Sequence, residues 1–310
     1  MKNVGFVTGP IKECGIHTYA MCVMEILKKS KKYNFHLLEV SNTTELLNLC
    51  QSKNIEAVIY NWHPAIMPWC TPDFVNQLTH LKQYIILGHE LSFETKQFTN
   101  ISGILTVDPL LPYVGISQPG VRPITYYDDI TYSPPSSILK IGTSGFGQQK
   151  KGFDALISIL NQQFVNEDVI LNVHSSVGYF VDPSGHTAMA SIRAYEHMLR
   201  PNIKLNITHQ FFEKQQLIRW LNGNDINLYC YHNYDGPGVS SSIDKALAAH
   251  KPIGVNTSNY FKHICKDEIN IYKTPIREIL ANGITPLQEY YDKWNPEQLL
   301  KQYENMIEII

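Results

Sequence analysis

The chain has 310 residues and a formal net charge of −2, and 44% of its residues are hydrophobic against 17% charged. At roughly 150 residues per domain, this length predicts two domains, and the composition is that of a globular protein. The near-neutral charge argues against a general nucleic-acid binder, because such proteins gain affinity from clustered Lys and Arg. Only a small local patch could hold a nucleic acid.

No apolar run approaches the roughly 20 residues of a membrane-spanning helix, so we expect no transmembrane segment. The N-terminal MKNVGFVTG is too short, and too soon interrupted by glycine, for a signal peptide. The six cysteines form no C-x-x-C pair, which argues against a zinc site. Several lie in apolar segments, where a reduced cysteine behaves as a small hydrophobe. We therefore expect a cytoplasmic protein with no bound metal.

Apolar runs of strand length alternate with helical patterns through the first half of the chain. Strands are expected at 4–9, 34–40, 55–63, 83–90 and 101–107, followed by the 114–124 region, and helices at 15–30, 43–53 and near 73–81. The strand runs are largely continuous and apolar, which is typical of a parallel sheet covered on both faces. A first domain is expected to span 1–130.

The stretch 126–137 lacks periodicity and contains Pro134-Pro135, so it is the best linker candidate. The alternation then restarts, with strands expected at 139–145, 169–176, 203–209, 226–232 and 252–257 and helices at 151–164, 186–199, 213–223 and 240–250. A second domain is expected at 138–290, with a last helix over 294–310. The predicted fold class is α/β, with two Rossmann-like parallel sheets that bind ligands outside the carboxyl ends of their strands.

The first of three glycine-containing strand-to-helix loops runs from Gly9 to Gly15. The N–H groups at the start of the following helix can bind an anion. The loop lacks the G-x-G-x-x-G spacing of a nicotinamide or flavin site. On this loop alone, a plain glycine turn is the simpler interpretation.

The second loop, 142–152, reads GTSGFGQQKKG and opens the second half of the chain. Its glycines, two hydroxyls and Lys151 suit a diphosphate, because backbone N–H groups and a mobile ammonium both bind phosphate oxygens. It is not a Walker A loop, since no G-K-[ST] follows at the required spacing. We interpret it as a binding loop rather than a polar turn.

The third loop precedes the helix expected at 240–250, and Asp235 and Asp244 bracket three serines at its start. Serines are good N-caps, and buried carboxylates there would suit sugar hydroxyls. Helix capping explains the serines but leaves Asp235 and the glycines of this loop unexplained.

Two histidines end predicted strands of the first half, His63 in NWHP and His89 in GHE. A single strand-end histidine is usually structural, but two on successive strands make a functional interpretation equally credible. The chain has no G-x-S-x-G elbow and no H-E-x-x-H, so hydrolases lack their motifs here.

These features together resemble the GT-B glycosyltransferases, and most closely the large retaining group called family 4 (glycosyl transferases group 1). The resemblance covers most of the chain and is stronger in the second half, where GTSGFG and KKG are followed by DGPG and ALAAHKP. It implies two domains facing across a cleft, with the segment 291–310 packing back on the first domain. It also implies transfer of a sugar from a nucleoside-diphosphate sugar, UDP- or GDP-linked, to a hydroxyl acceptor.

The resemblance assigns roles to individual residues. His89, Lys151 and Asp235 would be catalytic. The donor would be held by Ser144, Gly145, Phe146, Gly147, Lys151, His209, Gly238, Ser240, Ser241, Ser242 and Asp244. The acceptor side would be formed by Gly15, His17, Thr18 and His63, close to Gly9 and Cys14.

Two positions depart from the family pattern. No arginine precedes Lys151 in its loop, so another group must meet one phosphate charge. The family's second acid would fall at Lys245, and Asp244 is one residue earlier, which turns a helical side chain by about 100°.

The resemblance further implies retention of configuration, no cofactor, and no metal, because lysine and helix N-termini stabilise the leaving diphosphate. The acceptor would be a glycan, a lipid-linked molecule or a small molecule. A GT-B epimerase or phosphorylase and a non-catalytic sugar-nucleotide-binding protein remain alternatives. Transfer to a hydroxymethylated nucleic-acid base is a further one, which the net charge of −2 disfavours.

Overall fold

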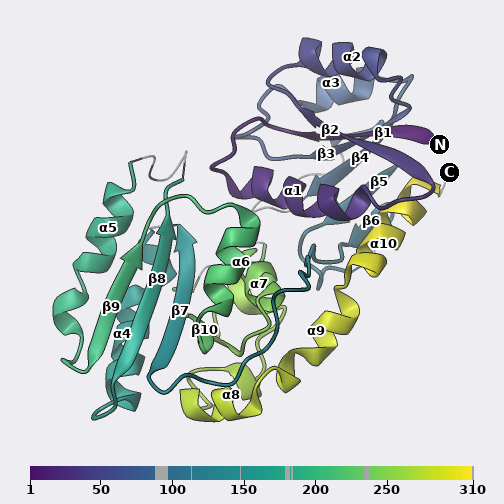
Figure 1. The fold of residues 1–310 in the computed structure, drawn as a ribbon. Coiled ribbons are helices and arrows are strands. Elements are labelled where there is room, and N and C mark those ends of the chain that lie inside the picture. The colour runs from purple at the N-terminus through teal and green to yellow at the C-terminus, as the bar shows by residue number, and fades with distance from the viewer. Residues whose placement is uncertain are drawn as a thin grey trace. The chain divides into compact units, whose positions relative to one another are not determined.

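The computed structural model of the chain describes residues 1–87, 97–112, 114–146, 148–178, 182, 184–233 and 238–308. The chain divides into two compact units, one comprising Met1–Thr125, Gly236–Val239 and Lys293–Ile310 and the other Tyr126–Asp235 and Ser240–Asp292. Each unit is built around one sheet (Figure 1). Every pairing between the named strands is parallel.

The first unit contains a six-stranded sheet in the order β2-β1-β3-β4-β5-β6. Its strands are β1 (Lys2–Thr8), β2 (Tyr33–Glu39), β3 (Ala57–Asn61), β4 (Lys82–Leu87), β5 (Gly103–Thr106) and β6 (Ser117–Pro119). The helices are α1 (Gly15–Leu27), α2 (Thr43–Ser52), α3 (Pro72–Gln77) and α10 (Pro296–Glu308). The chain leaves β1 for β2 on one side and continues to β3 on the other, so a topological switch point lies between β1 and β3.

Two apolar cores cover the two faces of this sheet. On one face, Val4 and Phe6 of β1 pack with α1 and with Leu299 and Tyr303 of α10. On the other face, Val7 of β1 packs in the core that α2 and α3 also enter. The continuous burial of β3 and of residues 83–86 in β4 follows from this cover on both sides, because every side chain of such a strand meets a helix.

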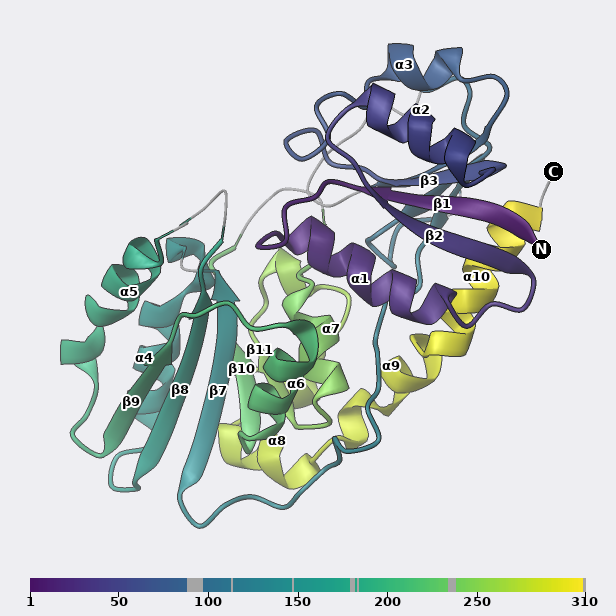
Figure 2. The ribbon, with the colours of Figure 1, turned by 45° about the horizontal axis from the view of Figure 1, so that its top comes forward.

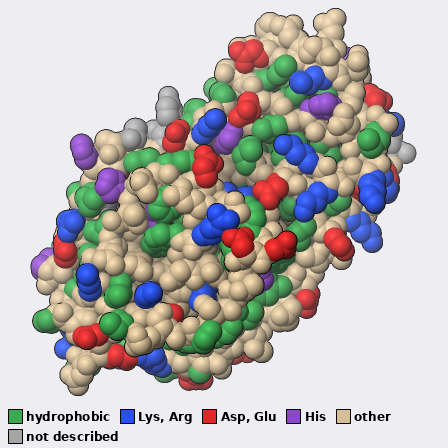
Figure 3. All heavy atoms as spheres, viewed as in Figure 1, with side chains coloured by type: hydrophobic (Ala, Val, Ile, Leu, Met, Phe, Trp, Pro, Cys, Tyr) green, Lys and Arg blue, Asp and Glu red, His purple; other side chains and the backbone are tan. Residues whose placement is uncertain are grey.

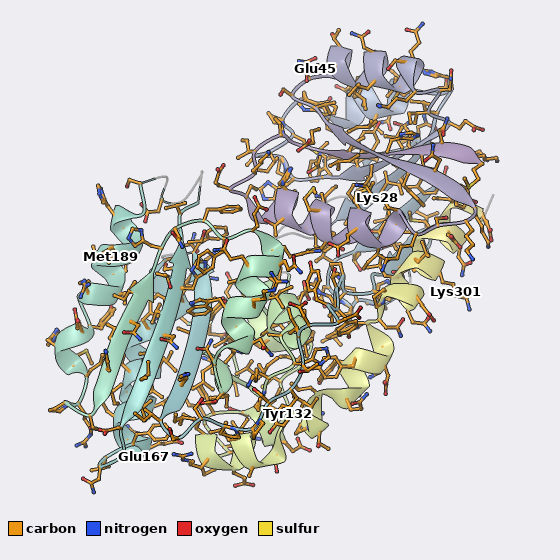
Figure 4. The ribbon with its side chains drawn as sticks, viewed as in Figure 1. Lys28, Glu45, Tyr132, Glu167, Met189 and Lys301 are labelled. Carbon is orange, nitrogen blue, oxygen red and sulfur yellow. The ribbon has the colours of Figure 1, made fainter. Side chains whose placement is uncertain are left out.

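The start of α2 shows how sequence sets a helix boundary in this unit. Asn42 is the N-cap, and its side-chain oxygen accepts a hydrogen bond from the backbone N–H of Glu45 at 2.9 Å. The Glu45 carboxylate in turn accepts from the backbone N–H of Ser41 at 2.7 Å, and Glu45 is labelled on α2 in Figure 4. The first bond satisfies a donor that the helix would otherwise leave without a partner, and the second ties the residue before the N-cap to the same helix turn.

The second unit contains a five-stranded sheet in the order β11-β10-β7-β8-β9. Its strands are β7 (Leu139–Phe146), β8 (Val169–Ser176), β9 (Ile203–Thr208), β10 (Ile226–Tyr229) and β11 (Ile253–Val255). The helices are α4 (Phe153–Gln163), α5 (His186–Arg193), α6 (Lys214–Asn222), α7 (Ser242–Ala248), α8 (Ile276–Asn282) and α9 (Gln288–Lys293). Here the switch point lies between β7 and β10.

In the second unit, β9 and part of β8 are covered by helices on one face only. In β9 (IKLNIT), the buried or half-buried Ile203, Leu205 and Ile207 alternate with the polar Lys204 and Asn206, both exposed. The apolar side packs in the core with α4. Figures 1 and 2 both show α4 behind β8 and β9 and no helix in front of these strands.

No helix in the described ranges is long and apolar enough to cross a membrane. Acidic and basic side chains are interspersed on the face shown in Figure 3. Among the same described residues, no group of three or more His, Cys, Asp or Glu side chains is placed to hold a metal ion.

Candidate functional site

The switch point of the second unit brings two of the predicted loops together. β7 ends in Ser144, Gly145 and Phe146, and the short helical turn Gln149–Lys151 follows it. β10 is hydrogen-bonded to β7 and leads to Tyr231, and α7 begins shortly afterwards. The carboxyl ends of two adjacent parallel strands therefore present their loops side by side.

Lys151 is held against an aromatic ring at this point. Its Nζ lies 3.8 Å from the centroid of the Tyr231 ring, a distance at which an ammonium is attracted to the ring face. A Cβ at Gly145 would lie 3.1 Å from Lys151 Cε and 3.2 Å from Tyr231 Oη. Glycine at 145 therefore leaves the lysine stem and the tyrosine hydroxyl room to meet.

Tyr231 is the centre of this cluster, and the sequence analysis did not single it out. Its Oη lies 3.1 Å from Ser242 Oγ and donates to the backbone carbonyl of Ser144 at 3.5 Å. Burial opposes ionisation of the phenol, but the Lys151 ammonium and hydrogen bonds from Lys151, Ser242 and Ser240 outweigh burial and lower the pKa of Tyr231. The cluster thus combines one ammonium group with several hydroxyl groups.

Gly152 explains the glycine that follows Lys151. It has a φ of 61° and is the N-cap of α4. A Cβ there would lie 1.8 Å from the carbonyl oxygen of Cys230, so any side chain would collide with the backbone after β10. The neighbouring backbone N–H of His232 donates to Lys150 O at 2.9 Å. The main chains of the two loops are therefore in direct contact on both sides of Lys151, and this contact fixes the position of the Lys151 backbone.

The three serines are not ordinary helix caps. Ser241 is the N-cap residue of α7, yet its side chain makes no cap hydrogen bond. Ser240 Oγ accepts from the backbone N–H of Ser242 at 3.3 Å, and the Ser242 hydroxyl meets Tyr231. Two of the hydroxyls thus extend the Lys151–Tyr231 cluster. Asp244 is buried in the first turn of α7, only 4% exposed.

One predicted donor residue, His209, is not part of this cluster. His209 follows β9, two strands away from β7. Beside it, burial and the nearby charge of His209 lower the pKa of His174 to about 4, and the His174 ring stacks on Phe212 at 4.2 Å. Gly238 has a φ of 103° and is grouped with the first unit. His89, Gly147 and Asp235 lie outside the described residues.

The predicted acceptor-side residues gather near the switch point of the first unit. His17 on α1 is buried, and its Nε2 lies 2.6 Å from Glu39 Oε1 at the carboxyl end of β2. Thr18 Oγ1 donates to Cys14 O at 3.0 Å within the first turn. Gly15 begins α1, and no atom lies within 4 Å of a Cβ built there. Sequence reasoning missed Glu39.

His63 follows β3, the other strand of this switch point. Its Nδ1 accepts from the backbone N–H of Ala65 at 3.2 Å, so part of its polar capacity is used in a local turn. Asn61, at the end of β3, donates to Ile16 O at 2.8 Å and ties the start of α1 to the strand ends. Local groups of the protein thus already pair with three of the predicted acceptor-side residues, His17, Thr18 and His63.

No protein-family model matches the chain, and no curated protein matches it by sequence. Solved structures do match along its whole length. HepE of Anabaena, solved in complex with UDP and glucose, has a TM-score of 0.67 at 10% identity, with 100% of each chain covered. The chain has the GT-B fold.

Two further solved structures agree with this fold at similarly low identity. A glycosyltransferase from Rickettsia africae has a TM-score of 0.69 at 12% identity, covering 99% of this chain and 98% of its own. Sucrose-phosphate synthase from Thermosynechococcus elongatus has a TM-score of 0.68 at 9% identity, with the same coverage. The GT-B architecture implied by the family resemblance is therefore confirmed.

Proposed function

We propose that the protein is a glycosyltransferase that moves a sugar from a nucleoside-diphosphate sugar to a hydroxyl acceptor. The second unit binds the donor, and the residues near Gly15, His17 and His63 serve the acceptor. The GT-B fold supports this proposal, and so does the UDP bound to the structurally similar HepE. The observation that carries it is the Lys151–Tyr231 cluster at the carboxyl end of β7.

The Lys151–Tyr231 cluster stabilises the diphosphate leaving group in the proposed reaction. When the bond between sugar and diphosphate breaks, the diphosphate gains negative charge, so a fixed ammonium favours the transition state over the bound donor. Lys151 is positioned for this by the Tyr231 ring and by the main-chain contacts of Gly152. Ser240 and Ser242 add hydroxyl donors to the same region.

Several finer assignments are part of the proposal. His89 and Asp235 act on the donor sugar, and Asp244 holds the ribose only if the ligand reaches its buried carboxylate. The reaction proceeds with retention and needs no metal, because Lys151 and backbone N–H groups meet the diphosphate charge. The acceptor is a glycan, a lipid-linked molecule or a small molecule, and the protein acts in the cytoplasm.

The test is turnover of UDP-glucose and GDP-mannose with a panel of hydroxyl acceptors, followed as release of the nucleoside diphosphate. Lys151→Ala is expected to lower kcat by about 10²–10³ and to weaken donor binding less. Lys151→Arg restores turnover only in part, because a planar guanidinium differs from a compact ammonium. Lys150→Ala is the matched control and retains turnover.

The absence of an arginine before Lys151 favours one alternative, a protein that binds the nucleotide sugar without transferring it. Nucleotide binding with no turnover across the whole acceptor panel would establish that alternative. Full turnover by Lys151→Ala would instead place the donor's diphosphate elsewhere.

A further inference from the structure

A cavity lies on the sheet of the second unit, away from the Lys151 loop. It has a volume of about 340 Å³ and lies on the side of β7, β8 and β9 opposite α4. We call it the amide pocket, and the lining residues used below are Lys140, Ile170, Asn172, Asn206, Trp220 and Asn224. Its volume is within the roughly 300–1,000 Å³ of small-ligand sites.

The polar wall of the amide pocket is a ladder of asparagine amides, in which each side chain is hydrogen-bonded to the next. Asn206 Nδ2 donates to Asn172 Oδ1 at 3.1 Å, and Asn172 Nδ2 donates to Asn224 Oδ1 at 2.8 Å. Asn224 Nδ2 donates to the buried Asn227 Oδ1 at 3.1 Å. Each amide is oriented by the next one, so the ladder presents a defined set of donors and acceptors.

The sheet is shaped to admit this ladder. A Cβ at Gly142 of β7 would lie 2.2 Å from Asn224 Nδ2 and 2.4 Å from Asn227 Oδ1. Any side chain at 142 would therefore displace the two inner amides. Glycine at this strand position lets a helix-end asparagine reach the sheet surface, and the ladder is held rigidly from its buried end.

Hydrogen-bonding groups remain free at the outer end. Asn206 is exposed, and within the described part of the chain its Oδ1 accepts no hydrogen bond from protein. The Trp220 indole N–H and the Lys140 ammonium make no side-chain hydrogen bond among the same residues. The half-exposed Trp220 ring supplies the apolar surface of the pocket, with Ile170 beside it.

This combination suits a neutral, hydroxyl-rich ligand. A hydroxyl both donates and accepts, so it can pair with an amide oxygen, an amide N–H and an indole N–H in one place. The C–H face of a sugar ring packs on an aromatic ring that has a polar edge. A polyanion would meet one cation among the lining residues, Lys140, and would face the Asn206 oxygen.

We propose that the amide pocket is a second saccharide-binding site, separate from the site of transfer. Lys140 and Ser144 are four residues apart on β7, which at about 3.3 Å per residue places the pocket roughly 13 Å from the Lys151 loop along the strand. The proposed ligand is a segment of neutral oligosaccharide, several sugars long. Its binding does not depend on transfer activity, so the proposal goes beyond the proposed function.

Trp220 gives a specific probe, because the other three tryptophans, Trp62, Trp69 and Trp294, belong to the first unit. The experiment follows the four indole N–H resonances of the intact protein during titration with maltotetraose, cellotetraose, chitotetraose and mannotetraose. The Trp220 resonance is assigned by Trp220→Phe. We expect at least one oligosaccharide to shift it, with and without saturating UDP and also in Lys151→Ala.

Two variants locate the binding. Trp220→Ala and Asn206→Ala are each expected to weaken oligosaccharide binding at least about tenfold. Calorimetry measures the affinity, because Trp220→Ala removes the indole resonance. Lys204→Ala is the control, since Lys204 is exposed on the same strand outside the pocket lining, and it retains full affinity. Asn206→Ala keeps the test decisive if Trp220→Ala does not fold.

Four results would overturn the proposal. The first is no shift of the Trp220 resonance by any of the four oligosaccharides at millimolar concentration. The second is an unchanged affinity in Asn206→Ala. The third is a shift that follows protein concentration rather than sugar, which would make the face a contact between copies of the chain. Loss of binding in the presence of UDP would likewise assign the sugar to the transfer site.

Discussion

Gly152 is the residue on which the position of Lys151 most depends. Its left-handed φ of 61° and its approach to Cys230 O leave no room for a side chain. Gly152→Ala is therefore expected to lower the free energy of unfolding by at least about 1–2 kcal/mol, the cost of the left-handed conformation for an L-residue. Urea unfolding measures this loss.

Gly15→Ala is the matched control, because a Cβ there meets nothing within 4 Å. Alanine at this helical position is expected to leave stability unchanged or to raise it slightly. Equal effects of the two substitutions would refute the geometric account of Gly152.

His174 predicts how the stability of the second unit depends on pH. Its folded pKa of about 4 lies below the ordinary value of 6.5, so between these values the unfolded chain binds more protons than the folded one. Stability is therefore full above pH 6.5 and falls as the pH drops toward 4, by about 3 kcal/mol in total from this group.

His174→Phe removes the titrating group and keeps a ring to stack on Phe212. The variant is expected to lose less stability than the wild type between pH 6.5 and pH 4, as measured by urea unfolding at each pH. The exposed His80→Asn serves as control and retains the wild-type dependence. An identical pH profile for His174→Phe and wild type would contradict the assignment.

At the scale of elements, α10 is the part of the first unit that comes from the far end of the sequence. Its Leu299, Tyr303, Met306 and Ile307 are all at most 5% exposed and pack with β1, β4 and α1. Leu299→Ala is expected to lower the free energy of unfolding by about 2–5 kcal/mol, the usual cost of a cavity in a core.

Lys301→Ala tests the opposite side of the same helix. Lys301 is exposed and is labelled on α10 in Figure 4, so its loss is expected to change stability by no more than about 0.5 kcal/mol. Urea unfolding of both variants, compared with a chain that ends before Trp294, shows how much the helix contributes. A mild Leu299→Ala would mean that α10 adds little to this core.

The order of strands and helices could be predicted from the sequence because most apolar runs are bounded by glycine, proline or charge on at least one side. The open face of β8 and β9 is not predicted by the continuous strands of the first unit. The alternation of apolar and polar residues in IKLNIT of β9 indicates one covered face but does not say which helix covers it. Which face a crossover helix leaves open depends on strand order, and strand order is not local in the sequence.

Some residues of the candidate site could likewise be predicted from the sequence, and others could not. Lys151 and its glycines could be found because loops that bind phosphate have a recognisable composition. Tyr231 and Glu39 could not, since a tyrosine or glutamate at a strand end has many ordinary uses. Only the meeting of β7 with β10, and of α1 with β2, gives these two residues their partners.

At the scale of the whole molecule, the GT-B fold and the near-neutral charge agree with a protein that binds a small anionic donor in one local cluster of charge. The second unit supplies that cluster from three chain segments around β7, β10 and α7. The proposed function therefore requires that the second unit binds a nucleoside diphosphate.

The most direct test is calorimetric titration of the wild-type protein and of Lys151→Ala with UDP and with GDP, supported by thermal unfolding. A nucleoside diphosphate at about 100 times its Kd is expected to stabilise the wild type by about 2.7 kcal/mol. We predict that one of the two nucleotides binds the wild type and that Lys151→Ala binds it more weakly. Absence of binding by both nucleotides, or equal affinity for both proteins, would contradict the assignment of the donor site.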